Sequence, residues 1–160
     1  LRPDAAGAIA MLNEAAVPVI VVSNQSGIGR GYLTQEDFDR VQARIEAALG
    51  ANGAHLDATY ICPHAPDEQP LCACRKPKVD LFLRAARDHG LDLARSWYVG
   101  DKWRDVEPGR VLGGSGRLVP AHSTPSEDLE RARSFGIVRG SLSDVASEII
   151  AALTGGHSRR

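Results

Sequence analysis

Residues 17–22 constrain the fold more than any other stretch, because five of these six residues are Val or Ile. No polar residue alternates with them, so the run predicts a strand that is buried on both faces, as in a parallel sheet. Parallel strands need long crossover connections, usually helices. The rest of the chain must therefore supply helices that cover both faces of this sheet.

Apolar residues recur at helical spacing on both sides of this strand. Ile9 and Leu12 predict a helix that starts near Pro3, and Thr34 is placed to cap a second helix that ends near Gly50. We expect further helices over 79–90, 103–112 and 141–153, and further strands over 58–61, 96–99, 118–119 and 136–138. This alternation predicts an α/β fold, a three-layer, Rossmann-like arrangement of an open parallel sheet between helices.

The composition is that of an ordinary globular protein, with 43% apolar and 24% charged residues in 160. We expect one domain over residues 1–154 and a frayed tail over 155–160. The 19 Lys and Arg residues against 20 Asp and Glu leave a net charge of −1. A nucleic-acid binder usually has a basic excess, so that class is disfavoured. No apolar run approaches the ~20 residues that cross a membrane.

The chain opens with Leu1, and no basic region followed by an apolar core is visible, so no signal peptide is expected. The three cysteines suit a reducing compartment better than a disulfide framework. We therefore expect a cytoplasmic protein without membrane or nucleic-acid partners, and a monomer.

All three cysteines lie within 13 residues and share that loop with a histidine, as Cys62, His64, Cys72 and Cys74. Three thiolates and one imidazole form a complete tetrahedral ligand set for zinc, with no position open for a substrate. We expect a structural zinc ion that fastens the loop 62–74, which has few apolar residues to pack. Three reduced thiols beside a surface histidine are the alternative, and other transition metals could use the same ligands.

Two polar segments could hold a phosphate. Ser23 and Asn24 directly follow the 17–22 run, and with the amides of the Gly-rich loop 23–31 they offer neutral donors to a phosphoryl oxygen. A plain polar turn would look the same. Arg75 and Lys76 follow the cysteine loop and could meet an anion, although adjacent basic residues are often only solvated.

A third polar segment suits a metal ion. Asp101 ends the strand predicted over 96–99, and Asp105 lies four residues later on the same face of the next helix. Carboxylates at a strand end suit Mg²⁺, which would be completed by water and substrate phosphate. An aspartate that caps the helix is the alternative.

Together these motifs resemble the haloacid dehalogenase superfamily of phosphotransferases over residues 3–119. The resemblance is closest to the zinc-containing D,D-heptose 1,7-bisphosphate and histidinol-phosphate phosphatases. The segment Val21-Val22-Ser23-Asn24-Gln25-Ser26-Gly27-Ile28-Gly29-Arg30-Gly31 resembles the second motif of the heptose enzymes. Residues 62–77 resemble both groups, and Val99-Gly100-Asp101-Lys102-x-x-Asp105 resembles the fourth motif.

The resemblance implies a role for each matching residue. Ser23 and Lys76 would hold the transferred phosphoryl group, and Arg75 would recognise the non-reacting end of the substrate. Asp101 and the carbonyl group of Lys102 would bind Mg²⁺, with Asp105 supporting them. The residues implied to line the substrate pocket are Ser23, Asn24, Gln25, Ser26, Arg30, Arg75 and Lys76.

The first motif of this superfamily, Asp-x-Asp-Gly-Thr, supplies the nucleophile from the end of a central strand, and the 160 residues do not contain it. The resemblance therefore implies a Mg²⁺-dependent, aspartyl-phosphate-forming phosphatase whose first strand and nucleophile are not in this sequence, and which is inactive without them.

The expected substrate is a small phosphorylated sugar, a heptose bisphosphate of lipopolysaccharide precursor synthesis, because Arg30 and Arg75 suit a second phosphate. Asp67 and Glu68 keep histidinol phosphate open as an alternative substrate. A zinc-containing domain that only binds a phosphorylated ligand is the third possibility.

Overall fold

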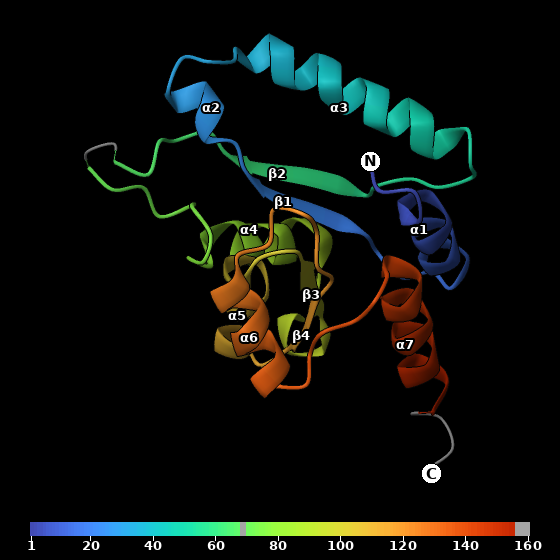
Figure 1. Ribbon diagram of the computed structural model, residues 1–160. Helices are drawn as coiled ribbons and strands as arrows, with labels where there is room; N and C mark the ends of the chain where they lie inside the picture. The colour runs from blue at the N-terminus through green and yellow to red at the C-terminus, as the bar shows by residue number, and fades with distance from the viewer. Residues whose placement is uncertain (68–69, 156–160) are drawn as a thin grey trace.

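The computed structural model describes residues 1–67 and 70–155 of the chain. In this part, the strands form two parallel pairs (Figure 1). β1 (Ile20–Asn24) pairs with β2 (Ala58–Cys62), and β3 (Trp97–Gly100) pairs with β4 (Ser115–Leu118). The predicted α/β class with parallel strands is confirmed. The single open sheet is not formed, because no described strand pairs with the second edge of β1 or of β3.

The longer helices flank these strand pairs. α3 (Gln35–Gly50) lies over the β1–β2 pair, and α1 (Ala5–Glu14) lies beside α7 (Leu142–Gly155) (Figure 1). α4 (Asp80–His89) contacts β2, while α5 (Trp103–Leu112) packs on β3 and β4 and contacts α6 (Ser126–Ser134). The short elements are α2 (Ser26–Gly29) and a 3₁₀ turn at Leu93–Arg95.

The helix ends follow the predicted local signals. The hydroxyl group of Thr34 accepts a hydrogen bond from the amide of Asp37 at 3.0 Å, and Asp37 accepts one from the amide of Thr34 at 2.9 Å. Gly90 ends α4 with φ of 64°, a conformation that glycine adopts without strain. Ser141 and Asp144 exchange the same pair of bonds at the start of α7.

Two apolar clusters form the core. One joins Trp103, Val106, Leu118 and Ala132 between α5, β4 and α6. The other joins Val119, Val145 and Ile149, with Val17 and Val99 packed against it. The second cluster connects α7 to both strand pairs, because residues near β1 and in β3 contact it. Among the described residues, no helix has both the length and the apolar character that a bilayer crossing requires.

Several predicted boundaries were wrong, each for a local reason. The first strand begins at Ile20 rather than residue 17, because Val19 is already bonded through both backbone groups to Asp57. The loop predicted over 23–31 contains α2. The strand predicted over 118–119 lies instead at Ser115–Leu118, and the one predicted over 136–138 is reduced to a single bridge between Leu118 and Val138.

The helix α6 was not predicted, because its sequence SEDLERARS is almost entirely polar and Leu129 and Ala132 alone mark its inner face. The tail predicted over 155–160 overlaps the end of α7, whose last residue is Gly155, and residues 156–160 lie outside the described residues.

Candidate active site

The carboxyl ends of β1 and β3 border a polar pocket of about 150 Å³. Its lining comes from the end of β1, the segment after the cysteine loop, and the start of α5. The lining residues are Ser23, Asn24, Lys76, Asp101, Lys102, Arg104 and Asp105. The structure thus brings together most of the residues that the sequence singled out, although Gln25, Ser26, Arg30 and Arg75 are not in this lining.

The side chain of Lys76 contacts both β1 and α5, and so connects the two halves of the fold. Its ammonium group donates to the carbonyl oxygen of Val22 in β1 at 2.5 Å and contacts the carboxylate of Asp105 in α5 at 2.7 Å. Its backbone is tied to Asn24 by two hydrogen bonds, at 3.0 and 3.2 Å. An ammonium group has three N–H donors, so one remains for a ligand in the pocket.

Asp105 serves this arrangement in a second way. Its carboxylate also accepts a hydrogen bond from the amide of Lys102 at 3.1 Å, which fixes the first turn of α5. Its side chain packs against Gly100, where an added Cβ would lie 2.3 Å from the Cβ of Asp105. Only glycine fits at that position, so the close packing of Asp105 explains Gly100 at the end of β3.

Asp101 does not cap α5, because the N-cap residue is Lys102. The backbone carbonyl group of Asp101 accepts a hydrogen bond from the hydroxyl of Thr124 at 2.8 Å. Its carboxylate has a long contact of 3.4 Å with the hydroxyl of Ser123, and it lines the pocket. This leaves a carboxylate with most of its acceptor capacity directed to solvent or to a ligand.

These groups fit Mg²⁺ in part. Mg²⁺ is usually bound by one or two carboxylates, with water and substrate oxygens completing six ligands. Asp101 offers one carboxylate, while Asp105 is engaged by Lys76 and by the amide of Lys102. Among the described residues, no group of three acidic side chains meets at this pocket.

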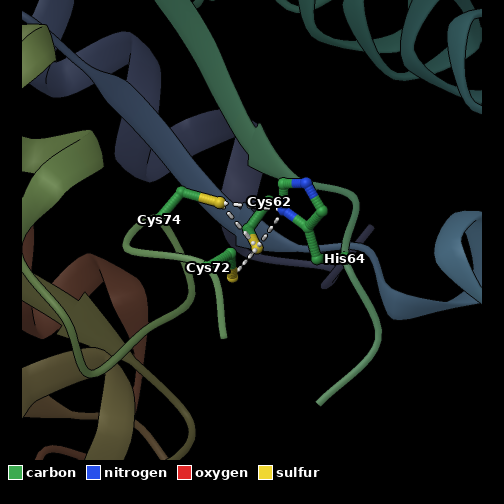
Figure 2. Close-up of side chains that lie close together, drawn as sticks. All are labelled: Cys62, His64, Cys72 and Cys74. Carbon is green, nitrogen blue, oxygen red and sulfur yellow. Dashed lines mark hydrogen bonds between the residues drawn. The ribbon is translucent and has the colours of Figure 1, made fainter. Parts of the chain in front are cut away.

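The cysteine loop forms a second polar cluster, at the end of β2 (Figure 2). The four predicted ligands place one ligand atom each within 4.8 Å of all the others. Cys62 Sγ lies 2.9 Å from Cys74 Sγ and 3.5 Å from Cys72 Sγ, and His64 Nδ1 lies 3.2 Å from Cys74 Sγ. A tetrahedral zinc ion with bonds of about 2.3 Å separates two sulfur ligands by about 3.8 Å, so a slight expansion admits the ion.

The pKa values of two thiols in this cluster are shifted in opposite directions. Burial, together with hydrogen bonds to Cys62 and Cys72, raises the pKa of Cys74 to about 12. Burial also opposes ionisation of Cys72, but hydrogen bonds from Cys62 and Cys74 outweigh it and lower its pKa to about 7. Adjacent thiolates repel one another, so the cluster needs a cation before all three thiols can ionise.

The cysteine loop is also joined to the loop after β1. The amide of Gly29 in α2 donates to the carbonyl of Pro63 at 2.8 Å. An added Cβ at Gly29 would lie 2.6 Å from the amide nitrogen of Ala65, so this approach requires glycine. Because Lys76 lies two residues after Cys74, the cluster and α2 together position the segment that enters the pocket.

The other expected substrate residues have different partners. Arg75 donates to the carbonyl group of His64 at 3.3 Å, and Arg30 contacts Asp67 at 3.5 Å. Gln25 donates to the hydroxyl of Ser23 at 2.8 Å and so orients it. Ser26 is the first residue of α2, and Glu68 lies outside the described residues.

Arg104 was not expected from the sequence. It lies in the first turn of α5, beside Asp105, and it contributes to the pocket lining. Its position between the two aspartates of the fourth motif was the available signal.

A second hollow, of about 260 Å³, lies between α3 and the β1–β2 pair, on the other side of Ser23. Its lining is mostly apolar and includes Val21, Phe38, Val41 and Ile45.

Known proteins are similar to this chain in sequence and in fold. The HAD-hydrolase-like family model matches residues 73–145. The D-glycero-beta-D-manno-heptose-1,7-bisphosphate 7-phosphatase of Helicobacter pylori is 46% identical over 92 residues, which are 57% of this chain and 52% of that protein. The protein of the same name in Haemophilus ducreyi is 34% identical over 134 residues, 76% of this chain and 74% of that protein.

A solved structure extends the match to three dimensions. The crystal structure of D,D-heptose 1,7-bisphosphate phosphatase from B. bronchiseptica, complexed with magnesium and phosphate, superposes with a TM-score of 0.82 at 30% identity. The superposition covers 94% of this chain and 84% of that one. The chain spans about half the length of the Helicobacter pylori relatives that it matches.

The fold, with its parallel strands, is thus that of a haloacid-dehalogenase-like hydrolase. Within that class, the chain belongs to the family of the D-glycero-β-D-manno-heptose-1,7-bisphosphate 7-phosphatases.

Proposed function

We propose that this chain forms most of a Mg²⁺-dependent phosphatase that removes one phosphate from a D,D-heptose 1,7-bisphosphate. The observation that carries the proposal is the position of Lys76, whose ammonium group is fixed beside Ser23, Asn24 and Asp101 in one polar pocket. A cation, neutral donors and a free carboxylate are the groups that a transferring phosphoryl requires.

In this proposal, each pocket residue has a defined task. The hydroxyl of Ser23, oriented by Gln25, donates to a phosphoryl oxygen, and the free N–H of Lys76 neutralises charge on the same group. Asp101 and the carbonyl of Lys102 would hold Mg²⁺, which supplies charge neutralisation for the phosphoryl oxygens when bound. The nucleophile would be an aspartate of an Asp-x-Asp-Gly-Thr motif, which the 160 residues do not contain.

The zinc ion has a structural role in this proposal, because the cysteine cluster leaves no position open for a substrate. We place the enzyme in the cytoplasm as a monomer whose partner is a small phosphorylated sugar, since reduced thiols suit a reducing compartment. The preference for a heptose bisphosphate over histidinol phosphate is supported by the names of the relatives that match.

A second candidate function is a zinc-containing domain that binds a phosphorylated ligand without hydrolysing it. The observation that favours it is that, in the described part of the chain, the polar pocket and the cysteine cluster offer groups to bind a phosphate and a metal without any nucleophile.

The test compares the 160-residue chain with a chain extended at Leu1 by a strand that carries this motif. The extended chain with Mg²⁺ should hydrolyse the heptose bisphosphate with a higher kcat/KM than histidinol phosphate, and the 160-residue chain should hydrolyse neither. In the extended chain, Lys76→Ala should lower kcat by about 100-fold or more, because it removes a charge that stabilises the transition state. Arg44→Ala, an exposed change on α3, is the control and should leave kcat unchanged.

Two results would count against the proposal. Turnover by the 160-residue chain that Ser23→Ala abolishes would show a different nucleophile. Faster hydrolysis of histidinol phosphate than of the bisphosphate would reverse the substrate preference.

A further inference from the structure

One segment holds the turn that carries the two proposed Mg²⁺ ligands. This turn, residues 100–103, leads from β3 into α5, and it is bonded along its length to residues 119–128, which lead from β4 into α6. Three hydrogen bonds of normal length join the carbonyl of Gly100 to the amide of Val119 at 2.9 Å, the carbonyl of Asp101 to the hydroxyl of Thr124 at 2.8 Å, and the amide of Trp103 to the carboxylate of Asp128 at 2.8 Å. The path of the turn therefore depends on a segment outside the sequence motifs.

Thr124 makes the bond nearest to the proposed metal ligands, and the direction of its hydroxyl group is fixed. The hydroxyl oxygen accepts a hydrogen bond from the amide of Ala121 at 2.8 Å, and the amide of Thr124 donates to the carbonyl of Ala121 at 3.0 Å. A hydroxyl group has one proton, and here that proton points at the carbonyl oxygen of Asp101. The bond is partly buried, which limits competition from water.

The carboxylate of Asp101 depends on its backbone for direction. Among the described residues, it has one polar contact, at 3.4 Å with the hydroxyl of Ser123, which is too long to orient a side chain firmly. The carboxylate of Asp105, by contrast, is fixed directly by the ammonium group of Lys76 at 2.7 Å. The backbone of Asp101 must therefore set where its carboxylate enters the pocket, and Thr124 holds that backbone.

We propose that Thr124 is a positioning residue of the candidate site, which aims the carboxylate of Asp101 at a bound Mg²⁺ ion by holding the backbone of Asp101. This inference rests on the function proposed above and adds to that site a residue from outside the pocket lining. Groups that orient a metal ligand typically contribute roughly 10- to 100-fold to metal affinity. Thr124 acts through the backbone, so its contribution should lie at the low end, about 10-fold.

The test measures binding of Mn²⁺ to the 160-residue chain after its cysteine cluster has been loaded with zinc. Mn²⁺ takes the same oxygen ligands as Mg²⁺, and the electron paramagnetic resonance signal of the free ion reports how much is bound. The unchanged chain should bind Mn²⁺, Mg²⁺ should displace it, and Asp101→Asn should remove most of this binding. Thr124→Val should weaken it by about 10-fold, because valine keeps the shape of threonine but cannot donate the bond.

Three further variants separate positioning from a general loss of stability. Thr124→Ser keeps the hydroxyl group and should restore most of the Mn²⁺ affinity. Thr154→Val makes the same change at an exposed residue of α7, whose hydroxyl bonds carbonyl groups of its own helix, and should leave the affinity unchanged. Thr124→Ala removes the hydroxyl with a smaller side chain, in case valine prevents folding. Circular dichroism and thermal melting establish which variants are folded at the temperature of the binding measurement.

The outcomes distinguish this inference from the function on which it rests. The role of Thr124 alone is overturned if a folded Thr124→Val or Thr124→Ala binds Mn²⁺ as tightly as the unchanged chain, or if Thr124→Ser binds it as weakly as Thr124→Val. Failure of both Thr124→Val and Thr124→Ala to fold would make Thr124 a structural residue and would overturn the inference as well. An unchanged chain that does not bind Mn²⁺, or an Asp101→Asn variant that binds it equally well, would overturn the proposed metal site itself.

Discussion

Glu148 has a lowered pKa that makes the stability of the fold depend on pH. It accepts hydrogen bonds from Arg117 at 2.9 Å and from Arg139 at 2.8 Å, and these bonds lower its pKa to about 2, although burial opposes the change. Its side chain is 30% exposed, which limits the energy of the pairs. The carboxylate joins α7 to β4 and to the chain just after Val138.

The sign of the pH effect follows from this lowered pKa. A carboxyl group with a folded pKa below its unfolded value stabilises the fold above the unfolded value of about 4.3, and that stabilisation is lost as the pH falls toward 2. Glu148→Gln should therefore lower the free energy of unfolding by about 1–2 kcal/mol at pH 7. The difference from the unchanged chain should shrink between about pH 4.5 and pH 2.

Urea unfolding at pH 7 and at several acidic pH values measures this difference. Glu130→Gln, an exposed change on α6, is the control and should stay within about 0.5 kcal/mol of the unchanged chain at every pH. A difference for Glu148→Gln that does not depend on pH would contradict the assignment.

The sequence predicted the location of a site residue where the backbone position alone brings it to the pocket. Ser23 lies near the carboxyl end of β1, and Asp101 directly follows β3. Carboxyl ends of parallel strands lie at one edge, so their meeting could be inferred from the sequence. The directions of long side chains could not. Arg75 turns to the carbonyl of His64, while Arg104 lines the pocket, and only the position of Arg104 between Asp101 and Asp105 pointed to this difference.

At the scale of elements, the cysteine loop is the segment whose stability we expect to depend on the proposed zinc ion. Its ligand atoms converge, and among the four ligands Cys62 alone is fully buried. Protein purified without added zinc should contain about one equivalent. A zinc ion present at 1,000 times its dissociation constant adds about 4 kcal/mol to stability.

Cys72→Ser should therefore remove the zinc and lower Tm on the order of 10 °C, as measured by metal analysis and thermal melting of the same samples. Ala73→Ser is the matched control, because it adds a hydroxyl group at an exposed position between two ligands without removing either one. Unchanged zinc content and Tm in Cys72→Ser would show that the cluster does not hold a metal.

Elements with strong local signals were predicted, and those without such signals were not. The hydrogen bonds between Thr34 and Asp37 and the left-handed Gly90 set helix ends in the expected places. α6 and β4 were missed or shifted because tertiary packing decides them. Gly116 packs against Val106, and Ala132 is buried beside Trp103, although neither residue suggests its element by composition.

In the whole molecule, β1 and β3 each have one edge that no described strand pairs with. Lys76 joins β1 to α5, the helix that follows β3, through Val22 and Asp105. The sequence predicted one sheet with helices on both faces and did not predict its separation into two strand pairs. Strand order depends on long-range pairing, which local sequence patterns do not encode. Unpaired strand edges expose backbone donors and acceptors, and the mostly apolar hollow beside Ser23 adds uncovered surface.

A strand inserted between β1 and β3 should therefore stabilise the whole fold. In the chain extended at Leu1 by a strand that carries Asp-x-Asp-Gly-Thr, amide exchange in β1 and β3 should slow by at least about 10-fold, because the new hydrogen bonds protect both edges. Hydrogen exchange followed by mass spectrometry measures this change segment by segment, and Tm should rise in the same samples.

An extension in which both aspartates are replaced by asparagine separates stability from catalysis. It should protect β1 and β3 equally well while giving no phosphatase activity, since amides cannot act as the nucleophile or as the general acid. Exchange on α6, which packs beside α5, should slow much less than exchange in β1 and β3 and serves as the internal reference. Equal exchange rates in β1 and β3 with and without the extension would show that the two strand pairs do not accept a strand between them.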